Sequence, residues 1–255
     1  MVIFDLRFMK TLKKIISFMH VAKWLVMTSS LTPSQKIFVV INRAILSKSA
    51  IIVDYSDKDR SDVVKLIIKV KNEVKMHMEI NEAYQLFMAV KRTQKVNGDI
   101  AEVGVFQGGS SKLICEAKKG RPLHLFDTFE GLPELSKEDE QGYFSKGEFD
   151  EVKLEEVKSY LKKYSNVYFY KGFFPSTAKP IKDKKFSFVN LDVDIYESTL
   201  SCLKFFYPRM SKGGIIISHD YINAIGVRKA FERFFRDKKE PIIELSGSQC
   251  LIVKV

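Results

Sequence analysis

The stretch Asp99-Ile-Ala-Glu-Val-Gly-Val-Phe-Gln-Gly-Gly-Ser-Ser111 decides the fold class of this 255-residue chain. It reads as a buried strand that ends in an acidic residue and a glycine, followed by a glycine-rich turn that opens a helix. Glycine lets a ligand approach bare backbone, and the N-terminus of a helix offers unpaired N–H groups. The stretch therefore predicts a cofactor site at the junction of a strand and a helix.

Beyond this stretch, short apolar runs alternate with amphipathic segments. The runs predict strands at 100–105, 123–127, 167–170, 186–191, 214–218, 242–245 and 250–253. The intervening segments predict helices at 110–118, 151–163, 196–207 and 226–236. Such alternation is typical of βαβ units with right-handed crossovers, so we expect an α/β fold with a mostly parallel, seven-stranded sheet flanked by helices. Residues 131–150 are charged and predict a mobile loop that closes over the site as a lid.

The chain before this sheet is predicted to be helical. Residues 60–96 are expected to be helical throughout, and Asn97-Gly98 ends that helix. The domain prediction is an added N-terminal helical region over 1–80 and a cofactor-binding domain over 81–255.

Within residues 1–50, apolar side chains recur at helical spacing from Leu12 to Val26, with lysines off that stripe. Two interpretations stay open. These helices pack on the main domain or on a second subunit of a homo-oligomer, or a basic amphipathic helix within residues 1–30 lies on an anionic membrane surface.

Composition narrows the functional class. The formal charge is +11 and the apolar content 45%, which fits a globular protein that meets an acidic substrate or an anionic surface. No RNA-reading motif occurs, so we expect no nucleic-acid partner. The three cysteines have no metal-binding spacing, and there is no secretory signal or uninterrupted apolar span. Buried, reduced thiols and a cytoplasmic location are therefore expected, with the inner membrane face as a peripheral position.

In an open parallel sheet the ligand lies beyond the carboxyl ends of the strands, so polar residues there are the candidates. Asp127 ends the second predicted strand and follows Gly104 by 23 residues, close to the interval at which an acidic residue meets a ribose. The glycine spacing from Gly104 to Gly108 is not that of a dinucleotide site, and no triphosphate-binding loop occurs. Asp127 therefore predicts a ribose contact without a pyrophosphate.

Three further carboxylates follow two strands that we expect to be neighbours: Asp192, Asp194 and Asp220. Carboxylates that converge in a crevice repel one another unless a cation neutralises them, and Mg²⁺ or Mn²⁺ prefers oxygen ligands. The other reading is that lysines pair with these acids. His219 lies beside Asp220 and is interpreted as a general base, a metal ligand or a substrate contact. Imidazole is a poorer partner than carboxylate for Mg²⁺, which favours the base or substrate roles. His20, His77 and His124 are expected to be structural.

With these residues assembled, the chain resembles the TylF/MycF-type family of O-methyltransferases, which act on macrolide sugars and related natural products. The resemblance covers about residues 80–236 and rests on six ordered motifs. These are Glu82-Ala-Tyr84, Gly98-Asp-Ile-Ala-Glu-Val-Gly104 with Gly108-Gly-Ser110, Leu125-Phe-Asp-Thr-Phe-Glu-Gly131, Gly172-Phe-Phe-Pro175, Leu191-Asp-Val-Asp-Ile-Tyr-Glu-Ser-Thr199 and Gly213-Gly214 with His219-Asp-Tyr221.

The resemblance implies a class I methyltransferase sheet that binds S-adenosyl-L-methionine. Glu102 and Gly104 would face the methionine part, and Asp127 the ribose. The implied cofactor contacts are Glu102, Gly104, Gly108, Ser110, Ser111, Asp127, Thr128, Gly172 and Phe174. Asp192 and Asp220 match the metal-binding acids, although the family carries an acidic pair where this chain has His219-Asp220.

These observations predict an O-methyltransferase, assisted by a divalent metal, that methylates a hydroxyl of a sugar, glycan or natural product. A metal bound to the hydroxyl lowers its pKa, and Asp194 or His219 accepts the proton. Two alternatives stay open: a metal-dependent glycosyltransferase that uses Asp192-Val-Asp194, and a non-catalytic cofactor-binding module.

Overall fold

The computed structural model describes residues 58–139 and 144–255. The chain divides into two compact units, residues 1–51 and 52–255, and the described residues belong to the second. The helices predicted within residues 1–50, including the predicted membrane-facing segment, lie outside the described residues. Among the helices that are described, none combines the length and the apolar character that a membrane crossing requires.

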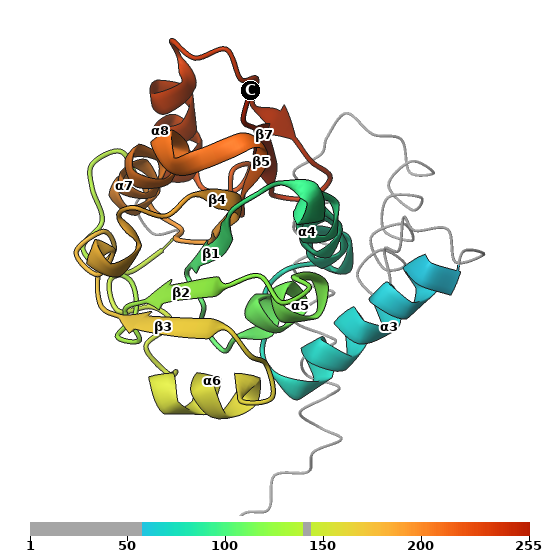
Figure 1. Ribbon diagram of the computed structural model, residues 1–255. Helices are drawn as coiled ribbons and strands as arrows, with labels where there is room; N and C mark the ends of the chain where they lie inside the picture. The colour runs from blue at the N-terminus through green and yellow to red at the C-terminus, as the bar shows by residue number, and fades with distance from the viewer. Residues whose placement is uncertain (1–57, 140–143) are drawn as a thin grey trace, which may run out of the picture. The chain divides into compact units, whose positions relative to one another are not determined.

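Seven strands and six α-helices make up the described part of the chain (Figure 1). The strands are β1 Asp99–Val103, β2 Leu123–Asp127, β3 Val167–Lys171, β4 Phe186–Leu191, β5 Met210–Ser218, β6 Ile243–Glu244 and β7 Cys250–Val253. The α-helices are α3 Lys58–Glu73, α4 Ile80–Arg92, α5 Gly109–Ala117, α6 Leu154–Leu161, α7 Tyr196–Phe206 and α8 Ile225–Phe235. Three short 3₁₀ helices are η1 Thr93–Lys95, η2 Lys179–Ile181 and η3 Tyr207–Arg209.

The strands form one sheet in the order β3-β2-β1-β4-β5-β7-β6. The first five of these are mutually parallel, whereas β7 runs antiparallel to both β5 and β6. The predicted mostly parallel sheet is therefore confirmed. The chain order reverses direction beside β1, between β1 and β4, and ligands bind at such a switch point in open α/β sheets.

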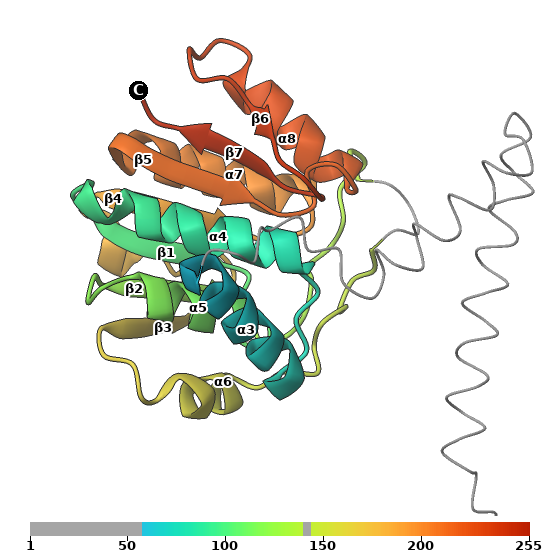
Figure 2. The ribbon, with the colours of Figure 1, turned by 90° about the vertical axis from the view of Figure 1, so that its right-hand side faces the viewer.

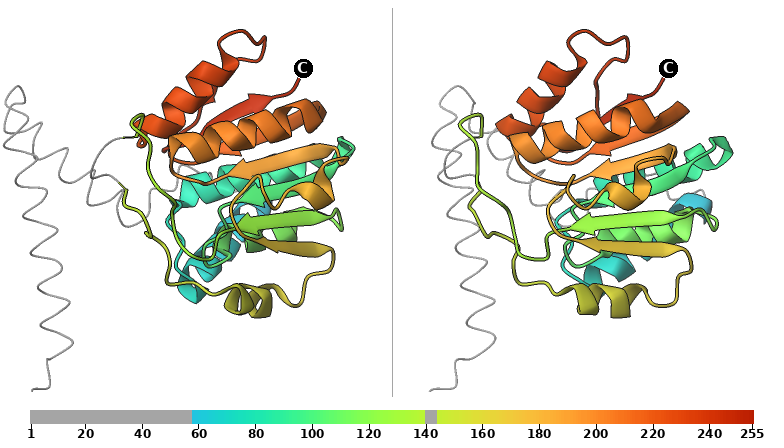
Figure 3. Two further views of the ribbon diagram at one scale, coloured as in Figure 1. Left: turned by 90° about the vertical axis from the view of Figure 1, so that its left-hand side faces the viewer. Right: turned by 60° about the vertical axis from the view of Figure 1, so that its left-hand side comes forward.

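Helices cover both faces of the sheet, as Figures 2 and 3 show from opposite sides. Helices α3, α4 and α5 lie over one face, with α6 beside them, and share a core that includes Ile67, Leu86 and Leu113. Helices α7 and α8 lie over the other face, where Phe206 and Phe231 are fully buried. Strand β4 is buried at all six positions, as expected for a central parallel strand covered on both sides.

One predicted element is wrong. Residues 60–96 do not form a continuous helix, because α3 ends at Glu73 and α4 begins at Ile80. The N–H of Glu79 donates to the side chain of Glu82 at 2.7 Å, which satisfies a free N–H at the start of α4. The connecting segment, residues 74–79, is thereby freed to reach the ligand side of the sheet.

The other elements lie where the sequence placed them, within a few residues. The largest shift is in β5, which begins at Met210, where it pairs with Phe186 across an irregularity in the register with β4. The three cysteines, Cys115, Cys202 and Cys250, are buried and unpaired, as predicted for Cys115 and Cys202.

Candidate active site

A cavity of about 510 Å³ opens at the carboxyl ends of the parallel strands, a size typical of a small-molecule site. Its lining includes ten of the candidate residues identified from the sequence: Gly104, Ser110, Asp127, Thr128, Gly172, Phe174, Asp192, Asp194, His219 and Asp220. Three others are not part of its lining: Glu102, Gly108 and Ser111. The described residues of the predicted lid that line it are Gly131, Leu132, Pro133, Phe144, Glu148 and Phe149.

Gly104 connects the glycine turn to the acidic strand. Its φ is +87°, and a Cβ added there would lie 1.8 Å from the carbonyl oxygen of Asp192. No side chain fits at that distance, so β1 and β4 approach each other closely only because position 104 is glycine. The turn and Asp192 are therefore held in one rigid unit.

Asp127 ties the end of β2 to the glycine turn. Its Oδ2 accepts hydrogen bonds from the backbone N–H groups of Val105 at 2.7 Å and Phe106 at 3.0 Å. Its Oδ1 accepts one from the N–H of Phe129 at 2.7 Å. Because a carboxylate has about four acceptor positions, Oδ1 retains one for a ligand hydroxyl. The geometry of Asp127 fits a ribose contact.

Glu102 has a structural environment. It is fully buried, accepts a hydrogen bond from the hydroxyl of Ser111, and accepts another from Nδ2 of Asn190 at 2.9 Å. Burial raises the pKa of Glu102 to about 7, against the lowering effect of those two donors, and the negative charge of Asp192 adds to the rise. Glu102 thus fastens β1 to α5 and β4 behind the cavity wall.

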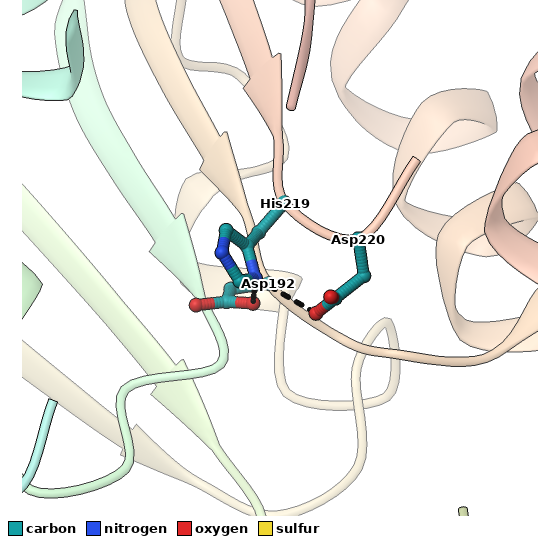
Figure 4. A group of neighbouring side chains, drawn as sticks. All are labelled: Asp192, His219 and Asp220. Carbon is teal, nitrogen blue, oxygen red and sulfur yellow. Dashed lines mark hydrogen bonds and ion pairs between the residues drawn. The ribbon is translucent and has the colours of Figure 1, made fainter. Parts of the chain in front are cut away.

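The acidic residues converge as expected, because β4 and β5 are hydrogen-bonded neighbours whose last residues pair as Leu191 with Ser218. Figure 4 shows Asp192 from the end of β4 facing His219 and Asp220 from the end of β5. Nδ1 of His219 lies 2.7 Å from Oδ2 of Asp220 and 3.3 Å from Oδ1 of Asp192. One ligand atom from each of the three residues lies within 4.8 Å of the others.

His219 is bound from both ends of its ring. Nε2 lies 3.2 Å from Oε2 of Glu82, on the side opposite Asp192 and Asp220. Burial lowers the pKa of His219, but the nearby carboxylates of Asp192, Asp220 and Glu82 outweigh it and raise the pKa far above its ordinary value. Without a metal the ring is therefore an imidazolium that donates from both nitrogens.

Asp194 differs from the other acids of the cluster. Burial raises its pKa well above the ordinary value, and the negative charges of Asp192 and Asp220 raise it further. Its backbone has a φ of +62°, which is uncommon for a residue other than glycine. Among the described residues, five of the seven non-glycine positions with positive φ line the cavity: Phe106, Phe129, Phe149, Asp194 and Asp220. Such strain gathers at functional sites.

The arrangement of Asp192, His219 and Asp220 fits a divalent cation. Two carboxylates and one imidazole point at a common centre, and a cation there would replace the Nδ1 proton of His219. Among the described contacts, no lysine forms an ion pair with Asp192 or Asp220. Both carboxylates pair with His219 instead, so the charge of the cluster is balanced from within.

Several cavity residues were not predicted. Glu82 belongs to the Glu82-Ala-Tyr84 motif, but its position in a predicted helix gave no sign that it contacts His219. His77 was expected to be structural within a helix, whereas it lies in the segment between α3 and α4 and lines the cavity. Phe173, which stands between the predicted cofactor contacts Gly172 and Phe174 and belongs to the segment predicted to face the cofactor, lines the cavity and is 43% exposed, whereas Phe174 is 5% exposed. His124 is structural as expected, with Nε2 2.9 Å from Asp99.

Comparisons with known proteins give the fold a name. The structure is similar to the O-methyltransferase NovP, with a TM-score of 0.60 and 24% identity over 71% of this chain and 82% of that one. It is also similar to a calicheamicin methyltransferase, with a TM-score of 0.59 and 18% identity over 80% and 95% of the two chains. The architecture is therefore that of the class I methyltransferases, as predicted.

Two curated relatives share part of the sequence. The 8-demethyl-8-(2,3-dimethoxy-alpha-L-rhamnosyl)-tetracenomycin-C 4'-O-methyltransferase of Streptomyces olivaceus is 31% identical over 170 residues, 60% of this chain and 64% of the relative. Mycinamicin III 3''-O-methyltransferase of Micromonospora griseorubida is 28% identical over 142 residues, 49% and 56% of the two chains. The matches thus span less than two thirds of these relatives.

The family model of macrocin-O-methyltransferase (TylF) matches residues 45–249, which is most of the chain and includes every residue of the site described above. On that match, the chain belongs to the macrocin-O-methyltransferase (TylF) family.

Proposed function

We propose that this protein is an O-methyltransferase that uses S-adenosyl-L-methionine to methylate a hydroxyl of a sugar, glycan or natural product. One observation carries the proposal: the glycine turn, the ribose-type Asp127 and the acidic cluster after β4 and β5 line a single cavity. A cofactor bound along the glycine turn and Asp127 would present its reactive end to the acidic cluster.

The cofactor half of the cavity has features that fit a nucleoside bound to an amino acid. The turn after Gly104 leads into the N-terminus of α5, where Ser110 lines the cavity. Asp127 retains an acceptor position for a ribose hydroxyl, and the exposed ring of Phe173 offers an apolar surface for a purine. No pyrophosphate-binding loop is present in the sequence, which favours this donor over a nucleotide-sugar.

In the acceptor half, Asp194 is proposed as the base that takes the hydroxyl proton. Burial and the negative charges of Asp192 and Asp220 raise its pKa, so its carboxylate binds a proton more strongly than an ordinary aspartate does. His219 is the weaker candidate because both ring nitrogens already face carboxylates. A divalent cation held by Asp192, His219 and Asp220 would supply Lewis acidity that lowers the pKa of the acceptor hydroxyl.

Alignment is the remaining contribution of the protein. A cavity that holds the donor methyl group and the acceptor oxygen in line can contribute about 7–11 kcal/mol to the lowering of the barrier. The loop residues Leu132, Phe144 and Phe149 line this cavity and would limit the entry of water, which competes for the methyl group. Closure of the loop as a lid is part of the proposal.

The relatives guide the choice of acceptor. By their names, the tetracenomycin and mycinamicin enzymes methylate hydroxyls at numbered positions of complex natural products, one of them bearing a rhamnosyl group. We therefore propose a deoxysugar or a related glycan as the acceptor class.

Titration calorimetry with S-adenosylhomocysteine and with UDP-sugars tests the proposal. We expect micromolar binding of S-adenosylhomocysteine and no heat from UDP-sugars. Methyl transfer from a radiolabelled donor to a panel of glycosides then tests catalysis, and Asp194→Asn should lower kcat about 10²–10⁴-fold while donor binding is retained. Binding of UDP-sugars in place of S-adenosylhomocysteine would support the glycosyltransferase alternative.

A non-catalytic module makes a different prediction. It would bind S-adenosylhomocysteine with the same affinity in the parent chain and in Asp194→Asn, and would transfer no methyl group in either.

A further inference from the structure

The carboxylate of Glu82 is one of the most completely bonded groups beside the cavity. Its side chain is buried, with 3% of the residue exposed. Oε1 accepts from the backbone N–H of Ser248 at 2.6 Å and from its hydroxyl at 2.8 Å. Oε2 accepts from the N–H of Glu79 at 2.7 Å and from Nε2 of His219 at 3.2 Å. All four acceptor positions are therefore occupied.

Three of these four donors do not belong to His219. They come from the start of α4 and from the loop between β6 and β7, so the carboxylate is held in place whether or not the histidine is present. The same loop approaches the carboxylate closely, since a Cβ added to Gly247 would lie 2.5 Å from Oε1. Glu82 is therefore a fixed acceptor, and the hydrogen bond from Nε2 of His219 to it orients the ring.

The contact with Glu82 determines which atom of His219 faces the acids. With Nε2–H donated to Glu82, Nδ1 is the nitrogen directed between Asp192 and Asp220. A histidine that binds a metal donates its other ring N–H to a carboxylate or carbonyl in just this way, which fixes the tautomer and the ring plane.

We propose that Glu82 is a positioning residue that makes His219 Nδ1 a metal ligand beside Asp192 and Asp220, and that this mixed nitrogen and oxygen site prefers a transition-metal dication to Mg²⁺. The inference rests on the proposed function, since it concerns the cation that the function uses. Imidazole nitrogen suits first-row transition metals, whereas Mg²⁺ is bound through oxygen. His219 thereby determines which cation the site prefers, and Glu82 determines the orientation of His219.

Electron paramagnetic resonance with Mn²⁺ tests the proposal on the full chain without any substrate. Free Mn²⁺ measured at room temperature gives its affinity, and displacement by Mg²⁺ gives the affinity of Mg²⁺. Pulsed spectra of the bound ion detect nitrogen coordination directly. We expect one Mn²⁺ per chain, a ¹⁴N coupling, and affinity at least tenfold tighter than that of Mg²⁺.

Variants separate the roles of the two residues. His219→Asp should abolish the ¹⁴N coupling and reduce the ratio of Mn²⁺ to Mg²⁺ affinity at least fivefold. Glu82→Gln keeps the volume but loses the charge, and should weaken Mn²⁺ binding 10–100-fold. Ser248→Ala removes a single donor to Glu82 and should weaken binding two- to fivefold, which provides a milder test if Glu82→Gln folds poorly.

Glu240→Gln is the matched control. Glu240 is also buried at 4% exposure and accepts hydrogen bonds from Tyr207 at 2.7 Å and Lys254 at 2.6 Å, and it is not part of the cavity lining. Its replacement should leave Mn²⁺ affinity within twofold of the parent chain, so a loss of binding in Glu82→Gln would not reflect the removal of a buried charge in general.

The proposal is overturned if bound Mn²⁺ lacks the ¹⁴N coupling, if no metal binds, or if Glu82→Gln binds Mn²⁺ as the parent does. Calorimetry with S-adenosylhomocysteine on the same samples keeps this result separate from the proposed function. A chain that binds S-adenosylhomocysteine but shows no nitrogen coupling contradicts only the metal assignment. A chain with nitrogen-bound Mn²⁺ and no affinity for S-adenosylhomocysteine contradicts only the proposed function.

Discussion

Two buried glutamates near the cavity, Glu82 and Glu102, have opposite electrostatic states. Glu82 has a pKa lowered to about 2, although burial opposes this, because it accepts hydrogen bonds from His219, Ser248 and Glu79. Glu102 has a pKa raised to about 7, because burial outweighs its hydrogen bonds from Ser111 and Asn190. Burial thus accompanies a carboxylate that is charged at neutral pH in one place and a carboxyl group that titrates near neutral pH in the other, and the hydrogen-bond donors decide which.

The contrast separates two tasks. The charged carboxylate of Glu82 faces the ring that completes the acidic cluster, so it belongs to the site. Glu102 has neutral donors and lies outside the cavity lining, so it holds β1 against its neighbours. Four substitutions test this division, in order of decreasing effect.

Glu82→Leu should have the largest effect on stability. It leaves Nε2–H of His219 and three backbone or hydroxyl donors buried without their acceptor, although Asp192 and Asp220 still face Nδ1, and we expect a cost of about 3–5 kcal/mol. Urea unfolding at pH 7 measures the free energy. A loss below about 1 kcal/mol would show that the two glutamates do not differ in the way described.

Glu102→Gln should change how stability depends on pH. The folded pKa is raised from 4.5 to about 7, so the protonated form favours folding. This contribution is fully present below pH 4.5 and is lost as the pH rises to about 7, a change of about 3 kcal/mol.

The variant lacks this titration, so the stability of Glu102→Gln relative to the parent should rise between pH 5 and pH 8. Urea unfolding across that range measures the difference. A constant difference would mean that the pKa of Glu102 is not raised.

Gly247→Ala should displace Glu82 without removing it. The added Cβ would lie 2.5 Å from Oε1 of Glu82, at a backbone φ of +103°. We expect a loss of about 2 kcal/mol from strain and displacement together. Gly120→Ala is the control, because Gly120 has a φ of +78° but no atom within 4 Å of an added Cβ. Equal losses in thermal unfolding of the two variants would contradict crowding at Glu82.

Ser111→Ala should have the smallest effect. It removes one hydroxyl donor from Glu102 and should cost about 1 kcal/mol at neutral pH. Since that hydrogen bond lowers the pKa of Glu102, its loss should also move the pH-dependent change in stability to higher pH. No movement of the profile would mean that Ser111 does not contact the carboxylate in solution.

The sequence was sufficient for the sheet and for most of the cavity. Strand ends could be located because apolar runs stop at polar residues, and parallel strands then place residues such as Asp127, Asp192 and Asp220 at one edge. The direction in which a side chain points is a different matter. Glu102 ends the same kind of run but turns toward Ser111 and Asn190, which no local pattern reveals.

The break between α3 and α4 was missed. Val74, Met76, Met78 and Ile80 alternate with polar residues at a period of two, which a helix does not show, so this stretch carried a signal of the break that the prediction of one continuous helix overlooked. The helix start at Ile80 depends on Glu82 and on the distant Ser248, and such contacts are tertiary. Glu82 itself meets a histidine 137 positions away, beyond the reach of any motif.

The hydrogen bonds from Ser248 to Glu82 determine when the site can form during synthesis of the chain. These residues are 166 positions apart, and Asn81 and Gln85 bond to Ser246 over similar separations. During synthesis the carboxylate that orients His219 cannot be fixed until Ser248 has left the ribosome, 30 residues after the end of β5 at Ser218. The site is therefore completed only after Ser248 has been synthesised, and a product truncated before Ser248 would lack the two donors that hold Oε1 of Glu82.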